Sequence, residues 1–531
     1  MSTPDTLELL GQRYGTAYRW LAAVTVLLGM LSSVLTTTVV NVAVPDIMGT
    51  FGMGQDHAHW LSTGALAGTS VAMLMQSWLV GRFGLRATFI SAMGVLLASL
   101  LLAAHAPDEN VLILARLVQG SVMGLMQPIA VFVLISVFPP DRKGQAMGMF
   151  GLVAIVGPAM GPVVGGIVIE YFNWRAIFYV SVPIAGIALL LGSIFLPQRA
   201  APGTGKPVKP FDWLSFTLVT TSIFCLLVAL STGQRLGWNS SEILLMVGVA
   251  LVCGVAFVLR ELRVESPLVE VRTMLVPDFA VAILLSFLFG AGLFGSTYLI
   301  PLFAQTVQSA TPSQAGLILL PGGLLLGLVM PISGYLADRM AARTMIVTGI
   351  LLFMVSSFAL ATVGVDTSYL AMAGIVAVGR VAVGAVNPSL NVAAISALPA
   401  AMLAQGAGLI NFARQLGGAF GVNGLSVALE YRMAFHSDAI TAAARSNAGA
   451  DLLRGVGSLL AAGGAPPDLQ SAGALHYFGT MIAAQAYSEA FRDIFYLLAI
   501  VFAIALLPAL VLRGKRAAPP PQAVPMDTAE T

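Results

Sequence analysis

Long apolar runs recur along nearly the whole 531-residue chain, with short polar segments between them. About 20 largely apolar residues are enough for a helix to cross a lipid bilayer. Only 9% of the residues are charged, whereas soluble globular proteins carry about 25%. So little charge cannot cover a water-facing surface. The chain is therefore predicted to be an all-α polytopic membrane protein.

Counting the apolar runs predicts fourteen transmembrane helices. The first six lie within 20–197, two more within 198–278, and the last six within 279–512. A cytoplasmic N-terminus (1–19) and a disordered, basic and then proline-rich cytoplasmic tail (513–531) are expected to flank them. The expected spans are 20–43, 58–80, 87–106, 111–137, 145–170, 176–197, 212–232, 242–260, 279–305, 311–337, 344–363, 368–397, 402–430 and 490–512.

The positions of lysine and arginine predict the orientation of these spans. Most of these residues fall in segments on the side that contains the N-terminus, and the short loops of the opposite side hold only Arg175 and Arg235. Cytoplasmic loops carry an excess of Lys and Arg. Both termini are therefore expected in the cytoplasm, which agrees with an even number of spans.

Other function classes find little support in the sequence. The net charge of +2 gives no basic field for nucleic acid. Cys225 and Cys253 both lie in apolar runs, so neither a disulfide framework nor a metal site is expected. PGTGKP (202–207) lacks the first glycine and the Ser/Thr of a phosphate-binding loop, and reads as a linker. No enzyme and no cofactor are predicted.

Two short segments repeat at a similar offset. SWLVGRFGLR (77–86) is similar to GYLADRMAAR (334–343), and RLVQG (116–120) is similar to RVAVG (380–384). Each pair falls at the same place within its set of six spans. The six-span sets are therefore predicted to be parallel structural repeats, and parallel halves around a central cavity are the architecture of major facilitator transporters.

Several ordered motifs extend this resemblance over roughly residues 20–512. LTTTVVNVAVP (35–45), RLVQGSVMG (116–124) and GLVAIVGPAMGPVVGG (151–166) resemble the first-, fourth- and fifth-span signatures of the fourteen-span drug:proton antiporters of the major facilitator superfamily (EmrB/QacA type). The other matching segments are WRAIFYVSVP (174–183), LPGG (320–323), GYLADR (334–339) and NFARQLGG (411–418).

The resemblance implies a bacterial inner-membrane multidrug efflux transporter. Such a protein exports amphiphilic small molecules by alternating access, exchanges them for protons and lies in membrane lipid. A periplasmic adaptor and an outer-membrane channel would be its partners, and the long outer segment 431–489 would meet the adaptor or merely cap the bundle. Two alternatives remain open: a dedicated exporter of an endogenous metabolite, fatty acid or lipid, and a transport-dead membrane sensor or scaffold.

Two departures from the family pattern affect proton coupling. Thr36 stands where the first-span signature has aspartate, and Gly81 replaces the aspartate of the first inner-loop motif. A threonine hydroxyl does not titrate near neutral pH, so Thr36 cannot carry a proton. Other carriers must then be sought near the span ends, and the candidates are Asp46, Glu170, Glu430, His57 and His59.

Polar residues inside the spans are the candidates for the transport pathway. An arginine costs about 2.5–3.5 kcal/mol in the middle of a membrane helix, so it is expected to face partners or a water-filled cavity. Threonines can instead bond their own helix, and polar side chains can join helices, so a structural role is the alternative reading. The candidate pathway residues are Thr36, Thr37, Asn41, Arg116, Gln119, Asn387, Asn391, Asn411 and Arg414.

A second group of residues is predicted to act in gating or packing. Three glycines of the fifth span are spaced by four, so they share one helix face and permit close approach of another helix. The prolines between them favour a bend. In the inner loops, the resemblance implies a charge latch. These residues are Gly157, Gly161, Gly165, Pro158 and Pro162 on the span, and Arg82, Asp338 and Arg339 in the loops.

Overall fold

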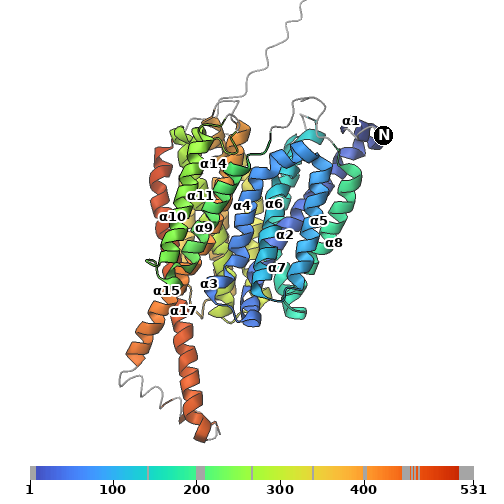
Figure 1. The fold of residues 1–531 in the computed structure, drawn as a ribbon. Coiled ribbons are helices and arrows are strands. Elements are labelled where there is room, and N and C mark those ends of the chain that lie inside the picture. The colour runs from blue at the N-terminus through green and yellow to red at the C-terminus, as the bar shows by residue number, and fades with distance from the viewer. Residues whose placement is uncertain are drawn as a thin grey trace, which may run out of the picture.

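The computed structural model consists of α-helices joined by short connections, and most of its described residues are helical (Figure 1). A bilayer offers backbone groups no water, and a helix satisfies them within one segment. The structure describes residues 7–139, 143–198, 210–264, 267–337, 340–398, 403–444, 455, 458–459, 462–463 and 467–512.

The first six-helix half begins with α2 (Tyr18–Phe51), which follows the short helices α1 (Leu7–Tyr14) and η1 (Gly15–Ala17). The sequence predicts that the first span ends at residue 43, but α2 continues to Phe51. Gly52 then caps the helix with a φ of 65°, a conformation that favours glycine. The short α3 (Gln55–Ala58) follows. The remaining helices of this half are α4 (Trp60–Phe83), α5 (Leu85–Ala104), α6 (Glu109–Val137), α7 (Lys143–Tyr171) and α8 (Ala176–Phe195).

Two inserted helices and a second six-helix half complete the bundle. The inserted pair is α9 (Trp213–Leu236) and α10 (Ser241–Glu261), and a short 3-10 helix, η3 (Val271–Leu275), leads into the second half. The second half contains α11 (Pro277–Thr306), α12 (Pro312–Ala337), α13 (Ala342–Leu360), α14 (Tyr369–Ser396), α15 (Leu403–Ala444) and α17 (Pro467–Val511).

The described part of the chain thus contains fourteen helices of 19 residues or more. Eleven of its helices are long and apolar enough, by length and composition, to cross a membrane. The other three long helices, α4, α7 and α15, pack between the two halves or next to that interface. The predicted all-α membrane fold is confirmed.

The two halves repeat the same helix pairs in close contact. In the first half α2 packs on α7 and α4 packs on α6; in the second, α11 packs on α15 and α12 packs on α14. Glycines make backbone contact in both halves: a Cβ at Gly120 of α6 would lie 1.9 Å from the Ala65 carbonyl oxygen, and one at Gly290 of α11 would lie 1.9 Å from the Arg414 oxygen. The predicted internal repeat is therefore visible in the packing.

The inserted pair contacts both halves through α9. Ser231 of α9 bonds His59 Nε2 of the first half at 2.9 Å, and the Leu227 carbonyl accepts from Asn423 Nδ2 of α15 at 2.9 Å. Arg260 of α10 pairs with Asp212 at the start of α9 at 3.0 Å. The two inserted helices are therefore held to each other and, through α9, to the bundle.

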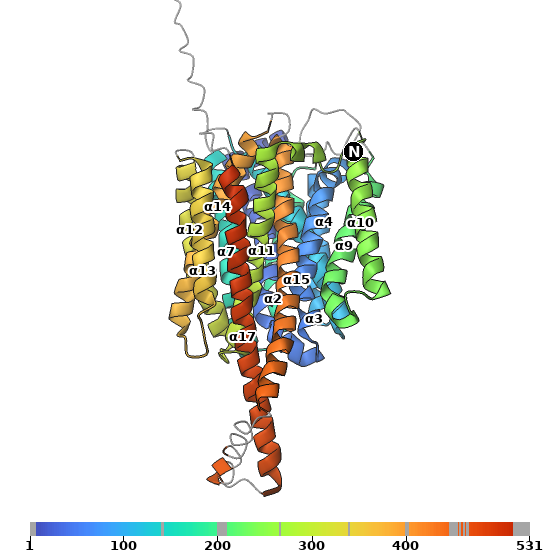
Figure 2. The same cartoon turned by 90° about the vertical axis from the view of Figure 1, so that its left-hand side faces the viewer.

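Helices α15 and α17 extend far beyond the rest of the bundle, at the end opposite to the N-terminus (Figures 1 and 2). The extensions continue directly from the thirteenth and the last expected spans, out to Ala444 and back from Pro467. At their base, Asp493 of α17 pairs with Arg432 and with His436 of α15. Most of segment 431–489 is thus two helical continuations rather than a separate cap.

The glycine contacts predict a sharp difference between two Gly→Ala substitutions. Gly120→Ala places a methyl group against the Ala65 backbone, and such overpacking costs about 1–3 kcal/mol. Gly94→Ala on α5 is the matched control, because nothing lies within 4 Å of its added Cβ. We expect Gly120→Ala to lower the melting temperature in detergent and Gly94→Ala to preserve or raise it. Equal melting temperatures would show that α4 and α6 are not in backbone contact.

Candidate functional site

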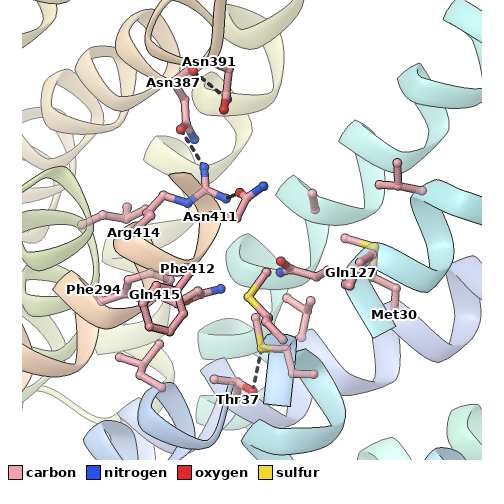
Figure 3. Close-up of a pocket in the computed structure, with 18 of the residues that line it drawn as sticks. Met30, Thr37, Gln127, Phe294, Asn387, Asn391, Asn411, Phe412, Arg414 and Gln415 are labelled. Carbon is pink, nitrogen blue, oxygen red and sulfur yellow. Dashed lines mark hydrogen bonds between the residues drawn. The ribbon is translucent and has the colours of Figure 1, made fainter. Parts of the chain in front are cut away.

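A cavity of about 1030 Å³ lies between the two halves. Its walls come from α2, α4, α6 and α7 on one side and from α11, α12, α14 and α15 on the other. Figure 3 shows Met30, Thr37 and Gln127 facing Arg414 and Phe412 across it. Apolar side chains predominate, with a few polar groups between them, as in small-molecule binding sites generally.

The polar part of the first-half wall comes from the threonine-rich stretch of α2. Thr37, Thr38 and Asn41 line the cavity, and Asn41 Oδ1 accepts a hydrogen bond from Ser62 of α4 at 2.7 Å. Thr37 Oγ1 bonds the Ser33 carbonyl one turn back at 3.0 Å. The threonine hydroxyls therefore bond carbonyls of their own helix and also face the cavity. The pathway role and the structural role expected from the sequence are thus compatible.

Arg116 of α6 lies behind this wall and not on it. Its side chain is completely buried. Nε donates to the Leu61 carbonyl at 2.8 Å, and the terminal nitrogens donate to the carbonyls of Thr36 and Thr37 at 2.8 and 3.0 Å and to Gln119 Oε1 at 2.8 Å. These acceptors are all neutral. The guanidinium group thus ties three helices of the first half together.

Thr36 and Gln119 also lie outside the cavity lining. Thr36 Oγ1 bonds the Ser32 carbonyl at 2.7 Å, so the residue at the family's carboxylate position bonds its own helix, and only its carbonyl reaches Arg116. Gln119 Nε2 donates to the Ser99 carbonyl of α5 at 3.1 Å. Both residues belong to the network that holds the first half together.

The second-half wall carries two arginines. Arg414 of α15 donates to Oδ1 of Asn387 at 2.8 Å and to Oδ1 of Asn411 (Figure 3). Arg380 of α14 donates to Thr297 Oγ1 of α11 at 2.7 Å. All five residues line the cavity. Of these, Arg414, Asn387 and Asn411 were predicted as pathway residues.

Asn391 lies on the same wall, one turn after Asn387 on α14. Its Nδ2 donates to the Asn387 carbonyl at 2.9 Å, so the two side chains follow one face of the helix, as their spacing predicted. Phe294, Phe412 and Gln127 line the cavity too. The sequence analysis did not single them out, because a phenylalanine, or a glutamine outside the matched motifs, gives no indication of which way it faces.

One end of the cavity is closed by direct contact between the halves. Gln305 Nε2 of α11 donates to the Val42 carbonyl of α2 at 3.0 Å. A Cβ at Gly316 of α12 would lie 2.3 Å from the Pro162 oxygen of α7. Nearby, Ser313 bonds the Glu170 carboxylate. Backbone contact leaves no passage between α7 and α12 at this end.

The opposite end of the cavity reaches the connections between helices. Ile135 near the end of α6, Phe150 near the start of α7 and Gly408 near the start of α15 all line it. The α10–α11 connection also contributes Val269 and Glu270, and the Val269 amide donates to the buried Glu261 carboxylate at 2.9 Å. The sequence analysis places no pathway residue in this connection, because a short polar loop gives no indication in sequence that it lies against a cavity.

The predicted gating residues divide into two groups. Gly157, Gly161 and Gly165 pack on α2, where added Cβ atoms would meet Val34, Thr38 and Val39. The glycine face is therefore packing within the first half, and Pro162 and Gly166 make the contact with the second half. Pro158 lies on α7, with its side chain outside the described part of the chain. Arg82 is exposed at the end of α4, and Asp338 and Arg339 lie outside the described residues.

Charged groups are few on the described cavity wall: Arg380, Arg414 and Glu270. The expected proton carriers lie elsewhere. Asp46 and Glu170 are exposed near helix ends, and Glu430 lies on α15 near the base of its extension. His57 pairs with Glu109 at 2.9 Å, and His59 is buried against α9.

Comparison with known proteins gives a consistent family assignment. The Major Facilitator Superfamily model matches residues 26–422. The uncharacterised MFS-type transporter YcnB of Bacillus subtilis (strain 168) is 31% identical over 395 residues, which cover 74% of this chain and 83% of YcnB. The multidrug export protein EmrB of Haemophilus influenzae is 29% identical over 416 residues, 78% of this chain and 81% of EmrB.

A solved structure shows the same fold at low sequence identity. It is a bacterial homologue of the human lysosomal transporter Spinster, in an inward-facing and unoccupied conformation. The TM-score is 0.62 at 14% identity, over 94% of this chain and 97% of that one. Such a match supports the arrangement of the helices and nothing about the ligand.

The position of Arg116 predicts a structural role that Arg414 does not share. Arg116→Met removes the donor that links the Leu61, Thr36 and Thr37 carbonyls across three helices, and it leaves the buried Gln119 Oε1 without this partner, at about 1–3 kcal/mol for an unsatisfied group. Arg414→Met is the matched control, because its side chain lines the cavity. We expect Arg116→Met to lower the melting temperature by several degrees or to abolish folded protein in gel filtration, and Arg414→Met to change it little. The reverse order would contradict this assignment.

Proposed function

The chain belongs to the Major Facilitator Superfamily, and we propose on this basis that it is an efflux transporter of the bacterial inner membrane. It exports amphiphilic small molecules of varied chemistry. The single observation that carries this proposal is the large, mostly apolar cavity between two six-helix halves that touch at one end. Relatives such as EmrB, described as a multidrug export protein, support export as the direction of transport.

The lining suits ligands that combine an apolar body with polar groups. Methionines at positions 30, 73, 123 and 330 line the cavity, and their flexible thioethers fill irregular gaps. Phe294 and Phe412 add flat apolar surfaces, and the asparagines and threonines supply hydrogen-bonding groups between them. A site of this kind adapts to several shapes, which supports a broad substrate range over a dedicated one.

Transport proceeds by alternating access between the halves. Both termini are cytoplasmic in this proposal, since Lys and Arg concentrate in the segments on that side. The cavity reaches the same side, near the α6–α7 and α14–α15 connections, so the described conformation faces inward. Export then requires α7 to part from α12 near Pro162 and Gly316, while the cytoplasmic ends close.

Proton antiport is the proposed source of energy, and Thr36 is not its carrier. The Thr36 hydroxyl bonds its own helix and does not titrate near neutral pH. Another titratable group must therefore bind the proton. Glu170 is a good candidate because it bonds Ser313 across the closed contact between the halves, so proton binding there would weaken the contact that must open.

The paired extensions of α15 and α17 are proposed as the docking site for a periplasmic adaptor. They project well beyond the other helices on the side opposite to the N-terminus. With both termini in the cytoplasm, this side is periplasmic. The Arg432–Asp493–His436 cluster at their base fixes the angle at which they leave the bundle.

Crosslinking across the closed contact tests alternating access. Tyr171→Cys, which leaves Glu170 in place, and Ser313→Cys are introduced into a background in which Cys225 and Cys253 are serine, and a short bifunctional thiol reagent joins the two. We expect crosslinked protein to lose export in proteoliposomes, because α7 and α12 can no longer separate. Each single cysteine treated in the same way is the control and should keep its activity. Full transport by crosslinked protein would rule out opening at this contact.

An imposed pH gradient tests the coupling. In proteoliposomes, exchange of one proton for one neutral molecule predicts about a tenfold concentration ratio for each pH unit, since 1.4 kcal/mol corresponds to a factor of ten. A protonophore should abolish the accumulation, and protein-free liposomes set the background. Flux that ignores the pH gradient would make the protein a facilitator or place its energy source elsewhere.

A further inference from the structure

The charges that line the cavity are unbalanced. Two arginines, Arg380 and Arg414, lie on the helical wall of the second half, and the remaining charged lining residue, Glu270, lies on the α10–α11 connection at the cavity edge. No carboxylate of the described lining residues pairs with either arginine. A cavity with two cationic groups in a low-dielectric surrounding attracts negative charge strongly.

The two arginines also have hydrogen-bonding capacity left over. A guanidinium group carries five N–H donors. Arg116 directs its nitrogens to four neutral acceptors inside the first half. Arg380, by contrast, donates to Thr297 alone among the described residues, and Arg414 donates to two asparagines. Most donors of Arg380 thus remain for a ligand, and guanidinium binds carboxylate or phosphate oxygens in bidentate fashion.

Contacts with α14 place the two arginines along one stretch of the wall, about two helical turns apart. Arg380 and Asn387 are seven residues apart on α14, which is two turns of one helix face, or about 10 Å along the axis. Arg414 of α15 reaches Asn387 from the neighbouring helix at 2.8 Å. The hydrogen bonds to Thr297 and Asn387 hold the two guanidinium groups apart in the structure, and the long arginine side chains allow both to swing toward one acid group placed between them.

Packing against α12 leaves room for the Arg380 side chain. A Cβ at Gly322 would lie 2.8 Å from Arg380 Cγ, so the absence of a side chain at Gly322 makes room for the arginine stem. Facing both arginines, the first-half wall supplies Met30, Val34 and Met123. A ligand that bridges the cavity therefore meets cations on one side and an uncharged, largely apolar surface on the other.

We infer that this cavity binds amphiphilic anions, with the acid group of the ligand held between Arg380 and Arg414 and its apolar body against the methionine-rich wall. The inference rests on the proposed export function and names the substrate class for the same cavity. The acid group can belong to a free organic acid or to the headgroup of an anionic lipid, which share this chemistry.

Binding to the purified full-length protein in phosphatidylcholine nanodiscs tests this directly. The probe is radiolabelled decanoate, and the competitors are decanoate, decanol and decyltrimethylammonium, which share one alkyl chain and differ in head-group charge. Empty nanodiscs give the lipid background. We expect decanoate to compete at least about tenfold better than decanol, and decyltrimethylammonium to compete worst, because a charge-assisted contact to two arginines is lost. Equal competition by all three would overturn the inference.

Matched variants assign the effect to the two arginines. Arg380→Gln with Arg414→Gln should reduce decanoate binding to the level of decanol. Arg380→Lys with Arg414→Lys keeps the charge and should retain a preference for the anion. Arg263→Gln removes the same charge at an exposed position outside the lining, and should leave binding unchanged. Each variant is compared at equal melting temperature and gel-filtration profile, and the lysine pair decides the question if the glutamine pair fails to fold.

Two further experiments distinguish the source of the acid group and separate the anion site from the export proposal. Phosphatidylglycerol added to the nanodiscs should weaken decanoate binding if an anionic lipid occupies the site, and should leave it unchanged if the ligand is a free acid. Export of decyltrimethylammonium by proteoliposomes, without anion preference in binding, would overturn the anion site and leave the export proposal standing. Anion binding without export of any probe would support the anion site and contradict the export proposal.

Discussion

Backbone contact between helices, made where glycine leaves out a side chain, is the constraint on which the rest of this structure depends. In lipid there is no hydrophobic force to press helices together, so close packing and polar contacts must do so. Gly120 against Ala65 and Gly290 against Arg414 bring helices together within each half. Gly316 against Pro162 uses the same contact between the halves. Contacts within each half involve many helix pairs, whereas those between the halves are concentrated on α7 with α12 and on α4 with α15, which allows the halves to move as units about these two seams.

The polar residues of the two halves also differ in what they contact. Arg116 and Gln119 make their hydrogen bonds within the first half, where they connect α2, α4, α5 and α6. Arg380 and Arg414 lie on the cavity wall of the second half, and their guanidinium groups have more N–H donors than their protein hydrogen bonds use. The first half therefore has a rigid interior and an uncharged cavity wall, and the second half supplies the charge. An asymmetry of this kind gives a ligand a defined orientation between two walls that are otherwise repeats.

Much of the fold could be predicted from the sequence, because span length, charge placement and the repeated motifs all depend on residues close together in the chain. The cavity wall was harder to predict. Thr36, Thr37 and Thr38 are consecutive, and only the helix rotation decides that Thr37 and Thr38 face the cavity while Thr36 does not. Likewise, the glycine spacing on α7 predicted a close contact, but the partner proved to be α2 of the same half.

Reciprocal movement of the two ends of the bundle is the central claim, and distances between spin labels measure it most directly. One pair joins Asp46→Cys of α2 to Thr311→Cys before α12, at the closed end, and the other joins Phe83→Cys of α4 to Thr344→Cys of α13, at the opposite end; all four positions are exposed. With substrate in nanodiscs, the account predicts a longer first distance and a shorter second one in the same fraction of molecules. Two distances that stay fixed, or that lengthen together, would contradict it.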